Sequence, residues 1–331
     1  MNKAVKRIII GTSVTAAGAA ALAAEAYLFT KKMMRIALDR DIPKNPGKSI
    51  SRISGSLPDA EIMAKIKTAA SELKEKITKT VEISSYDGEK LVGHFYENKS
   101  PKRIIIAMHG WRSSWANDFG SISEFWHSNN CSVLYAEQRG QNNSGGDFIG
   151  FGLIERYDCL EWAKWVNEIT GKKLPIYLAG ISMGASTVLM ASGLKLPENV
   201  AGIMSDCGFT SPQSIWKHVV ENNLNLSYGM ISGVANDICK KKINMSANDY
   251  STIDALTENT IPILLIHGTD DTFVPIDMTY ENYKACTAPK RILVVPGAGH
   301  AMSYIVDKKS YEDEVNEFWK SCENIYQNSN N

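Results

Sequence analysis

The chain has 331 residues, of which 44% are hydrophobic and 22% are charged, and its formal net charge is zero. Such a composition is typical of a globular protein that can bury a sizeable core, as one large domain or one domain with an insertion. The balanced charge and the lack of a basic cluster argue against a nucleic-acid partner. The six cysteines form no CxxC pair, which argues against a zinc site, and we expect mostly reduced thiols.

An apolar segment rich in Ala and Gly occupies residues 8–29, with basic residues on both sides. As a helix it would extend about 33 Å, close to the thickness of a bilayer core. Three interpretations remain open: an uncleaved membrane anchor, a signal peptide cleaved at the A-x-A match at 24–26, or a surface helix of a soluble enzyme. We assign residues 1–37 to this segment and expect membrane association, with a cytoplasmic or a secreted enzyme as alternatives; basic flanks at both ends leave the orientation open.

Residues 38–78 are predicted to be a linker followed by an amphipathic helix. The linker, 39–58, contains three prolines and no apolar period. Apolar residues then recur at three- and four-residue steps between 62 and 77, which predicts a helix with one apolar face. We expect this helix to lie against the main domain rather than to bind a partner.

The main domain, 79–326, alternates strand-like and helix-like segments. Alternating residues around Asp87-Gly88 predict a hairpin over 81–97. Continuous apolar runs, typical of strands buried on both faces, lie at 104–108, 133–136, 176–179, 201–204, 261–266 and 292–295. Helix-length segments lie between them at 117–129, 151–169, 183–194, 277–287 and 308–326. The pattern predicts an α/β protein with a mostly parallel central sheet and helices on both faces.

One interval is too long for a simple connection. About fifty residues separate the strand that ends near Asp206 from the strand at 261. We predict a small helical cap inserted over the sheet at about 210–259. A polar tail, 327–331, ends the chain.

The segment GISMG places Ser182 between Gly180 and Gly184, after a strand-like run and before a helix-like one. This is G-x-S-x-G in the strand–turn–helix context that an exposed nucleophilic serine requires. The turn is so sharp that a side chain at either flanking position would clash, which explains both glycines. A serine in an ordinary glycine-rich turn is the alternative.

A nucleophilic serine needs a base that is oriented by a carboxylate. Asp270 and Asp271 follow the predicted strand 261–266, and His300 follows the strand 292–295 in a glycine-rich loop. Both positions are carboxyl ends of parallel strands, where open α/β sheets hold their ligands. Of the six histidines only His300 follows the acid; the others are His94, His109, His127, His218 and His267. We interpret His109 and His267 as residues that hold their loops.

Taken in order, these motifs resemble the α/β-hydrolase superfamily over roughly residues 80–320. HGTDDTFVP at 267–275 is similar to the HGxxDxxVP signature, in which the acid lies three residues before Val. The resemblance therefore implies Asp271 as the acid of a triad with Ser182 and His300, and leaves Asp270 as a loop residue. The oxyanion would be bound by the backbone N–H of Met183 and, by similarity to an HGW turn, of Trp111.

The segment AEQRGQNNSGG at 136–146 resembles the D-x-R-G-H-G-x-S-x-G stretch of the superfamily but departs from it. Glu137 stands at the acid and Gln141 at the histidine, whereas Arg139, Gly140 and Ser144 match. We expect this segment to order the loop beside the nucleophile.

The resemblance implies a serine hydrolase that cleaves a carboxylic ester, or an amide or peptide bond, through an acyl-enzyme and without metal or organic cofactor. The chain looks most similar to bacterial serine-aminopeptidase-like and feruloyl-esterase-like hydrolases. Its partner would be a small-molecule ester or a short peptide. An acyltransferase with the same machinery, or a non-catalytic membrane-tethered binding protein, is the alternative. We expect the cap and Trp111 to shape the acyl pocket; Trp115 could do so or could be a packing residue.

Overall fold

An eight-stranded sheet forms the centre of the protein, whose computed structural model describes residues 3–41, 59–171 and 173–329. The strand order is β1-β2-β4-β3-β5-β6-β7-β8. Only β2 runs against its two neighbours, and all other pairs are parallel. The strands are β1 Lys79–Ser84, β2 Lys90–Tyr96, β3 Arg103–Met108, β4 Cys131–Ala136, β5 Ile176–Ile181, β6 Val200–Asp206, β7 Ile263–Gly268 and β8 Lys290–Val295. The predicted α/β fold with a mostly parallel sheet is confirmed.

Each predicted strand exists, with small differences at its ends. The hairpin turn falls at Asp87-Gly88, where Gly88 has a φ of 87°. The strand predicted from 261 begins instead at Ile263. Pro262 precedes it and has no N–H to donate to a neighbouring strand, although its carbonyl accepts from the Ile203 N–H at 2.9 Å.

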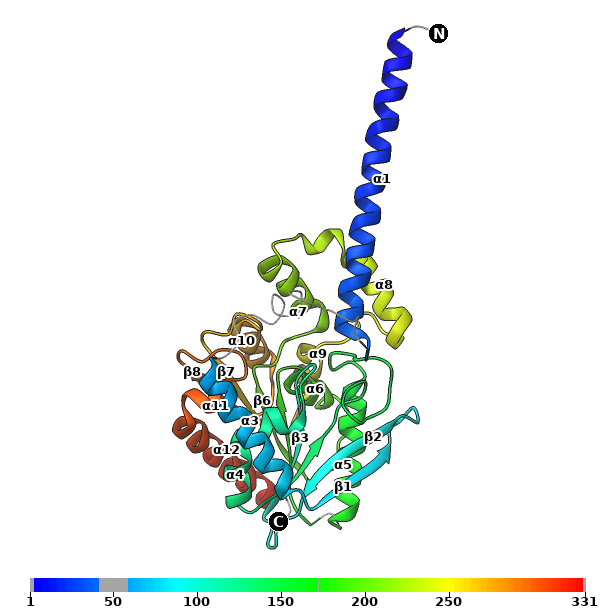
Figure 1. Cartoon of the computed structure of the whole chain (residues 1–331). Coiled ribbons are helices and arrows are strands. Elements are labelled where there is room, and N and C mark those ends of the chain that lie inside the picture. Colours follow the sequence, from blue (N-terminus) through cyan, green and yellow to red (C-terminus); the bar gives the residue numbers. More distant parts are fainter. Residues whose placement is uncertain (1–2, 42–58, 172, 330–331) are drawn as a thin grey trace.

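Successive side chains of the strands enter two different cores, one on each face of the sheet. In β3, Ile105 and Ala107 face one core, whereas Ile104, Ile106 and Met108 face the other. The first core lies under helices α3 Ala60–Lys76, α4 Trp115–Ser128 and α12 Lys308–Ser329, which Figure 1 shows on the same side of the sheet. The second lies under α5 Glu155–Ile169, α6 Met183–Ala191 and α10 Ile276–Ala285.

Helix α3 is the predicted amphipathic helix, and it packs on α4 rather than standing free. Its apolar face buries Ala70 and Leu73. At the crossing, a Cβ added to Gly120 of α4 would lie 2.7 Å from the backbone of Ala69, so only glycine allows this approach. The Asp59 carboxylate caps the first turn by accepting the Ile62 N–H at 2.8 Å.

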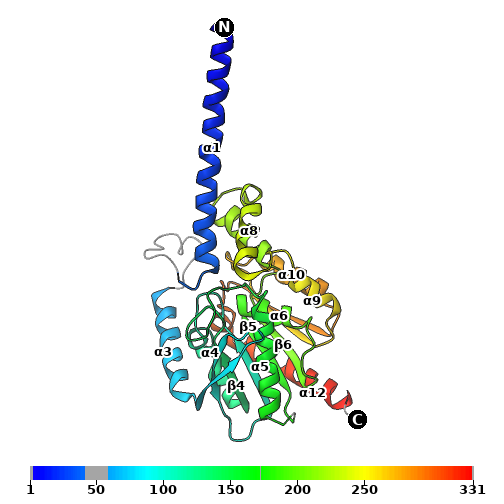
Figure 2. The same cartoon turned by 90° about the vertical axis from the view of Figure 1, so that its right-hand side faces the viewer.

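The interval between β6 and β7 folds as the predicted helical cap. It contains α7 Pro212–His218, a π-helical turn Val219–Asn223, a 3₁₀ turn Tyr228–Met230, α8 Ser232–Ile243 and α9 Thr252–Glu258. The cap lies over one end of the sheet, beside the base of helix α1 Lys3–Leu38 (Figure 2). Apolar side chains of the cap, of α1 and of the segment 148–154 share a third core.

The C-terminal turns of helix α1 pack on the domain. Thr30, Met34, Ile36 and Leu38 are buried, whereas Leu28 is 63% exposed. Towards its N-terminus the helix extends straight away from the domain (Figure 1). The boundary that we predicted at residue 37 therefore falls inside a part of α1 that is packed on the cap. Most of the predicted linker, 42–58, lies outside the described residues.

Across the described ranges, no helix has both the length and the apolar character that a membrane span requires. The interpretation of 8–29 as a transmembrane helix is therefore not supported. All six cysteines are free and buried.

Candidate active site

Ser182 lies on a strained turn between β5 and α6. Its backbone has φ 56° and ψ −116°, in a region that residues with a side chain rarely adopt. A Cβ on Gly180 would lie 2.2 Å from the Gly184 carbonyl oxygen, and one on Gly184 would lie 1.8 Å from the Met108 carbonyl oxygen. Both flanking glycines are therefore required for the turn. The Ser182 N–H donates to the Asp206 carbonyl at 2.9 Å, which ties the turn to β6.

Three side chains from three loops meet at this turn. His300 Nε2 lies 2.8 Å from Ser182 Oγ, and His300 Nδ1 lies 2.7 Å from Asp271 Oδ2. Asp271 follows β7 and His300 follows β8, so both stand at the carboxyl ends of parallel strands. The structure thus brings together the serine, histidine and aspartate that the sequence indicated, in the arrangement in which an aspartate orients the histidine that accepts the serine proton.

The neighbouring carboxylate, Asp270, is exposed and points elsewhere. Its Oδ1 accepts a hydrogen bond from Thr269 Oγ1 at 2.7 Å. Asp271 is 7% exposed, and its Oδ1 accepts the N–H groups of Phe273 and Val274, each at 2.9 Å. Those bonds fix the Asp271 carboxylate, so the geometry favours Asp271 as the residue that orients His300.

His267 contacts Asp271 and the loop that carries it. Its Nε2 lies 2.9 Å from the Val274 carbonyl and 3.2 Å from Asp271 Oδ2, so the Nε2–H is shared between the two acceptors. Its Nδ1 then accepts from Thr279 Oγ1 at 2.6 Å. His267 therefore holds the acid loop in place, as we expected from its position at the end of β7.

The electrostatic field of the site keeps Asp271 charged and makes His300 more basic. Burial opposes ionisation of Asp271, but the charge of His300 and hydrogen bonds from His267 and His300 outweigh it and lower the Asp271 pKa. Burial likewise disfavours the charged form of His300, but Asp271, with a smaller contribution from Asp206, raises the His300 pKa above its usual value. A proton accepted from Ser182 is thereby stabilised on the imidazole.

Asp206, the last residue of β6, is a member of this site that the sequence analysis did not single out. It is buried, and burial raises its pKa to about 6, against the influence of His267 and of a hydrogen bond from Ser303. The only sequence signal for it was its position at the carboxyl end of a buried parallel strand. Its charge acts on His300 over a distance, without a direct hydrogen bond.

The loop after β3 lies against the nucleophile. A Cβ on Gly110 would lie 3.4 Å from Ser182 Cβ, so the backbone of this loop approaches the serine closely. The Gly110 N–H donates to Asp118 Oδ2 at 2.6 Å, and the Arg112 N–H donates to Gln141 Oε1 at 2.6 Å. Between them, the Trp111 N–H has no acceptor in the described part of the chain. It is free to bind an oxyanion, as is the Met183 N–H.

The Met183 N–H belongs to the first turn of α6, where backbone N–H groups have no intrahelical acceptor. His109, at the start of the loop after β3, is fully buried, with Nδ1 2.8 Å from the Gly110 carbonyl and Nε2 accepting the Gln138 N–H at 3.1 Å. Burial lowers the pKa of His109, which keeps it neutral. This histidine therefore shapes the loop, as expected, and does not reach Ser182.

The segment 136–146 departs from the superfamily pattern, and Glu137, which differs from that pattern, fixes its conformation. Glu137 pairs with His94 at 2.8 Å and accepts the Asn143 N–H at 2.5 Å. Ser144 Oγ donates to the Glu137 carbonyl at 2.7 Å. The glutamate thus closes the loop locally.

Arg139, which matches the pattern, is buried between two acids and binds Asp158 (Nη2 to Oδ1 2.5 Å) and Asp87 (Nη1 to Oδ2 2.7 Å). Gln141, which replaces the histidine, uses its Oε1 to accept the N–H of Arg112. The departure at 141 therefore connects this segment to the loop after β3.

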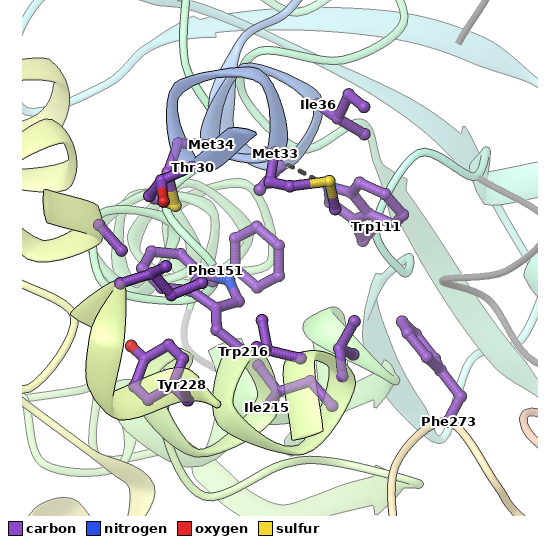
Figure 3. A pocket seen from close by; sticks show the side chains of 15 residues that line it. Thr30, Met33, Met34, Ile36, Trp111, Phe151, Ile215, Trp216, Tyr228 and Phe273 are labelled. Carbon is purple, nitrogen blue, oxygen red and sulfur yellow. Dashed lines mark hydrogen bonds between the residues drawn. The ribbon is translucent and has the colours of Figure 1, made fainter. Parts of the chain in front are cut away.

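An apolar cavity of about 70 Å³ opens beside the site, between the cap and α1. Figure 3 shows Trp111 and Phe273 at one side of it and Trp216 and Tyr228 of the cap at another. Phe273 also packs edge-on against His300, with ring centroids 4.9 Å apart, which connects the cavity to the site. Trp115, for which the sequence left a pocket role and a packing role open, does not line the cavity; it is buried and stacks on His94, as a packing residue does.

A second cavity, of about 370 Å³, is lined by His300 itself. It is more polar than the first, and helices α3, α4 and α11 Ser303–Val306 border it. Asp206, Asp118 and Tyr304 line it together with His300. The site thus adjoins two cavities: His300 lines the more polar one, and Trp111 and Phe273, next to the site, line the apolar one.

Cys207 comes near the site without a geometry that suits a metal ion. Its ligand atom lies within 4.8 Å of those of Asp271 and His300. Both of these side chains are engaged with each other and with Ser182, and burial raises the Cys207 pKa well above its usual value. Without a metal ion the thiol therefore stays protonated, and each ring nitrogen of His300 already has a partner in the triad.

The fold and the geometry around Ser182 define an α/β-hydrolase. The sequence profile of the prolyl oligopeptidase family matches residues 117–325, and the chain belongs to that family. Among curated relatives, YqkD of Bacillus subtilis is 25% identical over 229 residues, which cover 68% of this chain and 73% of YqkD. YfhR of Escherichia coli K12 is 22% identical over 233 residues, which cover 67% and 72%.

Solved structures show the same fold. The Pyrococcus furiosus esterase Pf2001 has a TM-score of 0.61 and 22% identity, covering 73% of this chain and 90% of the esterase. Est1E of Butyrivibrio proteoclasticus, solved with ferulic acid, has a TM-score of 0.54 and 17% identity, covering 73% and 98%. An acylaminoacyl peptidase has a TM-score of 0.57 and 16% identity, covering 73% and 41%. The resemblance to feruloyl-esterase-like proteins is therefore shown for the fold; the narrower placement beside serine aminopeptidases stays a prediction.

We expect Asp271→Asn to lower kcat by about 10⁴-fold, the scale known for an aspartate that orients a catalytic histidine. The amide would no longer hold His300 in the tautomer that accepts the serine proton. Asp270→Asn is the matched control, because Asp270 is exposed and does not contact His300. Steady-state kinetics on an activated ester would compare the two variants; a large loss in Asp270→Asn instead would assign the acid to the wrong residue.

The pH dependence should report the raised pKa of His300. His300 accepts the serine proton only when neutral, so kcat/KM should fall as the pH drops through a pKa above the ordinary 6.5. In Asp206→Asn one of the negative charges that raise this pKa is removed, and the acid limb should move to lower pH. A kcat/KM–pH profile measures this shift. An acid limb at the wild-type position would exclude a role of Asp206 in tuning His300.

Proposed function

We propose that this hydrolase is a serine carboxylesterase that forms an acyl-enzyme on Ser182. The observation that carries the proposal is the continuous chain of Ser182 Oγ, His300 and Asp271, with distances of 2.8 and 2.7 Å, beside an apolar cavity. Such a chain activates a serine that would otherwise be a weak nucleophile.

In the proposed reaction, Ser182 Oγ attacks the ester carbonyl carbon while its proton passes to His300 Nε2. The N–H groups of Trp111 and Met183 stabilise the oxyanion of the tetrahedral intermediate. His300 then gives its proton to the leaving alcohol, and the C–O bond breaks. Water, activated in turn by His300, attacks the acyl-enzyme and releases the acid.

The two cavities suggest which part of the substrate lies where. The leaving oxygen must receive its proton from His300, so the alcohol lies on the side of the cavity that His300 itself lines. The acyl group, which stays attached to the carbonyl carbon, then points towards Trp111 and the apolar cavity. An apolar acyl group fits a lining formed by aromatic and aliphatic side chains.

Ester hydrolysis is supported over peptide hydrolysis by the esterases Pf2001 and Est1E among the structural neighbours. An amide or peptide bond is the second candidate, because a peptidase also shares this fold. Acyl transfer would use the same acyl-enzyme with an acceptor other than water. A binding protein without catalysis would leave Ser182 unreactive.

A fluorophosphonate probe should label the wild type at Ser182 and should not label Ser182→Ala, because the probe reacts with an activated serine. Hydrolysis of p-nitrophenyl esters beside aminoacyl p-nitroanilides, measured on both proteins, separates esterase from amidase activity. We expect turnover of esters only, and no turnover by Ser182→Ala. Labelling at another residue would contradict the assignment of the nucleophile, and preferred cleavage of anilides would favour the peptidase.

We also propose that the protein associates with a membrane through α1. Support comes from the apolar segment 8–29 with its basic flanks and from the way in which α1 extends beyond the domain (Figure 1). Cell fractionation should find the wild type in the membrane pellet, and a triple variant Ile8→Asp, Ile9→Asp, Ile10→Asp in the supernatant with unchanged ester hydrolysis. Equal distribution of the two proteins would contradict membrane association through this segment.

A further inference from the structure

The C-terminal turns of α1 form one wall of the apolar cavity beside the active site. Five of the 15 residues that line this cavity belong to α1, and Figure 3 shows the helix opposite the cap residues Ile215 and Trp216. The five are Thr30, Met33, Met34, Ile36 and Ala37. A helix that is remote in sequence from every catalytic residue thus encloses the space that we assign to the acyl group.

The end of α1 is bound by the loop after β3, which contains Trp111 and approaches Ser182 at Gly110. The last carbonyls of a helix have no intrahelical donors, and they attract cations because they form the negative end of the helix dipole. Here Arg112 donates Nε to the Ile36 carbonyl at 2.9 Å and Nη2 to the Asp39 carbonyl at 2.5 Å. The Trp111 indole Nε1 donates to the Ala37 carbonyl at 2.9 Å.

The loop depends on these contacts for its shape. Arg112 has a φ of 53°, a left-handed conformation that is unfavourable for a residue with a long side chain. Such a conformation persists where surrounding bonds enforce it, and Arg112 is held on both sides. Its guanidinium binds α1, and its N–H donates to Gln141. The Trp111 N–H lies directly before this strained residue.

The carbonyl of Leu38, between those of Ala37 and Asp39, is also bound by the main domain. The Ile149 N–H donates to the Leu38 carbonyl at 2.7 Å, and Lys242 of the cap pairs with Asp39 at 2.5 Å. Three successive carbonyls, of residues 36, 37 and 38, are therefore each bound by a donor from the main domain. This part of α1 has a defined position, in contrast to the exposed surface around Leu28.

We propose that residues 30–38 of α1 contribute to substrate selection and to the geometry of the active site. They select an aliphatic acyl chain by forming a wall of its cavity. Through Arg112 they also position the loop after β3, which carries the proposed oxyanion donor Trp111. This inference rests on the proposed esterase function and adds the class of acyl group and a positioning residue. It also follows that cleavage at the A-x-A match, which would remove residues up to 26, leaves this wall in place.

The wall is tested by Met33→Trp in the full-length protein, with Lys32→Ala on the exposed side of the same turn as the control. Kinetics would compare p-nitrophenyl octanoate with p-nitrophenyl acetate, which is too short to enter the cavity. We expect Met33→Trp to lower kcat/KM for the octanoate by about tenfold, the scale of a filled apolar pocket, and to leave the acetate unchanged. Equal effects on both esters, or no effect on either, would overturn the role of α1 as a wall.

The positioning role is tested by Arg112→Met, with Arg112→Lys as the conservative variant. Arg112→Met should lower kcat by about tenfold for both esters with KM unchanged, less than the ~10²-fold expected when an oxyanion donor is removed outright. Arg112→Lys should recover part of kcat, because an ammonium can still bind the helix carbonyls. Thermal unfolding confirms that each variant is folded. Wild-type kcat in Arg112→Met would overturn the positioning role.

A binding measurement separates this inference from the proposed function. Calorimetry with octanoate on Ser182→Ala requires no turnover, and adding Met33→Trp should weaken the affinity by about tenfold. If octanoate binds in this way while the wild type hydrolyses no ester, the wall is supported and the esterase proposal falls. If the wild type is an active esterase and octanoate affinity does not respond to Met33→Trp, the wall is overturned and the esterase proposal stands.

Discussion

A close approach of two backbone segments beside Ser182 determines the geometry of the active site. Gly184 at the start of α6 meets the Met108 carbonyl at the end of β3, with no room for even a Cβ. This contact holds the turn that carries Ser182 against the end of β3, which the loop containing Gly110 and Trp111 follows directly. Because β3 and β5 are also paired in register from Ile104 to Met108, the sheet itself sets the distance between nucleophile and loop. The acid and the base then need only follow the neighbouring strands β7 and β8.

Hydrogen bonds within the protein stabilise the buried charge of this site. Asp271 is buried and keeps its negative charge because His267, two backbone N–H groups and His300 surround it with donors. Asp206 has fewer such partners, and burial raises its pKa to about 6. The two carboxylates, on adjacent strand ends, thus differ in pKa because they differ in hydrogen bonding. Asp271 orients His300, and the negative charge of Asp206 raises the His300 pKa further.

Local patterns in the sequence were sufficient to predict the sheet, the helices around it, the cap and the candidate residues Ser182 and His300, because strand ends and tight turns leave local signals. They left Asp270 and Asp271 open, and only the resemblance to the superfamily signature favoured Asp271. The sequence could not indicate Asp206 or Asp118, since each is a common residue whose meaning arises from groups far away in the chain. Trp115 shows the opposite case. An aromatic residue near the site suggested a pocket wall, but its indole fills the interior against His94.

The N-terminal segment shows most clearly why the sequence could not indicate which residues belong to the enzyme domain. Its composition suggested a separate anchor, and the predicted boundary separated residues 1–37 from the enzyme. In the structure the helix crosses that boundary, because Arg112 and Trp111 supply donors for carbonyls that a helix end leaves free. The contacts join positions more than seventy residues apart, beyond the reach of any local pattern. A segment whose sequence suggests a separate anchor therefore lines the cavity beside the site. The carbonyls of its last turn accept hydrogen bonds from Trp111 and Arg112 of the loop after β3.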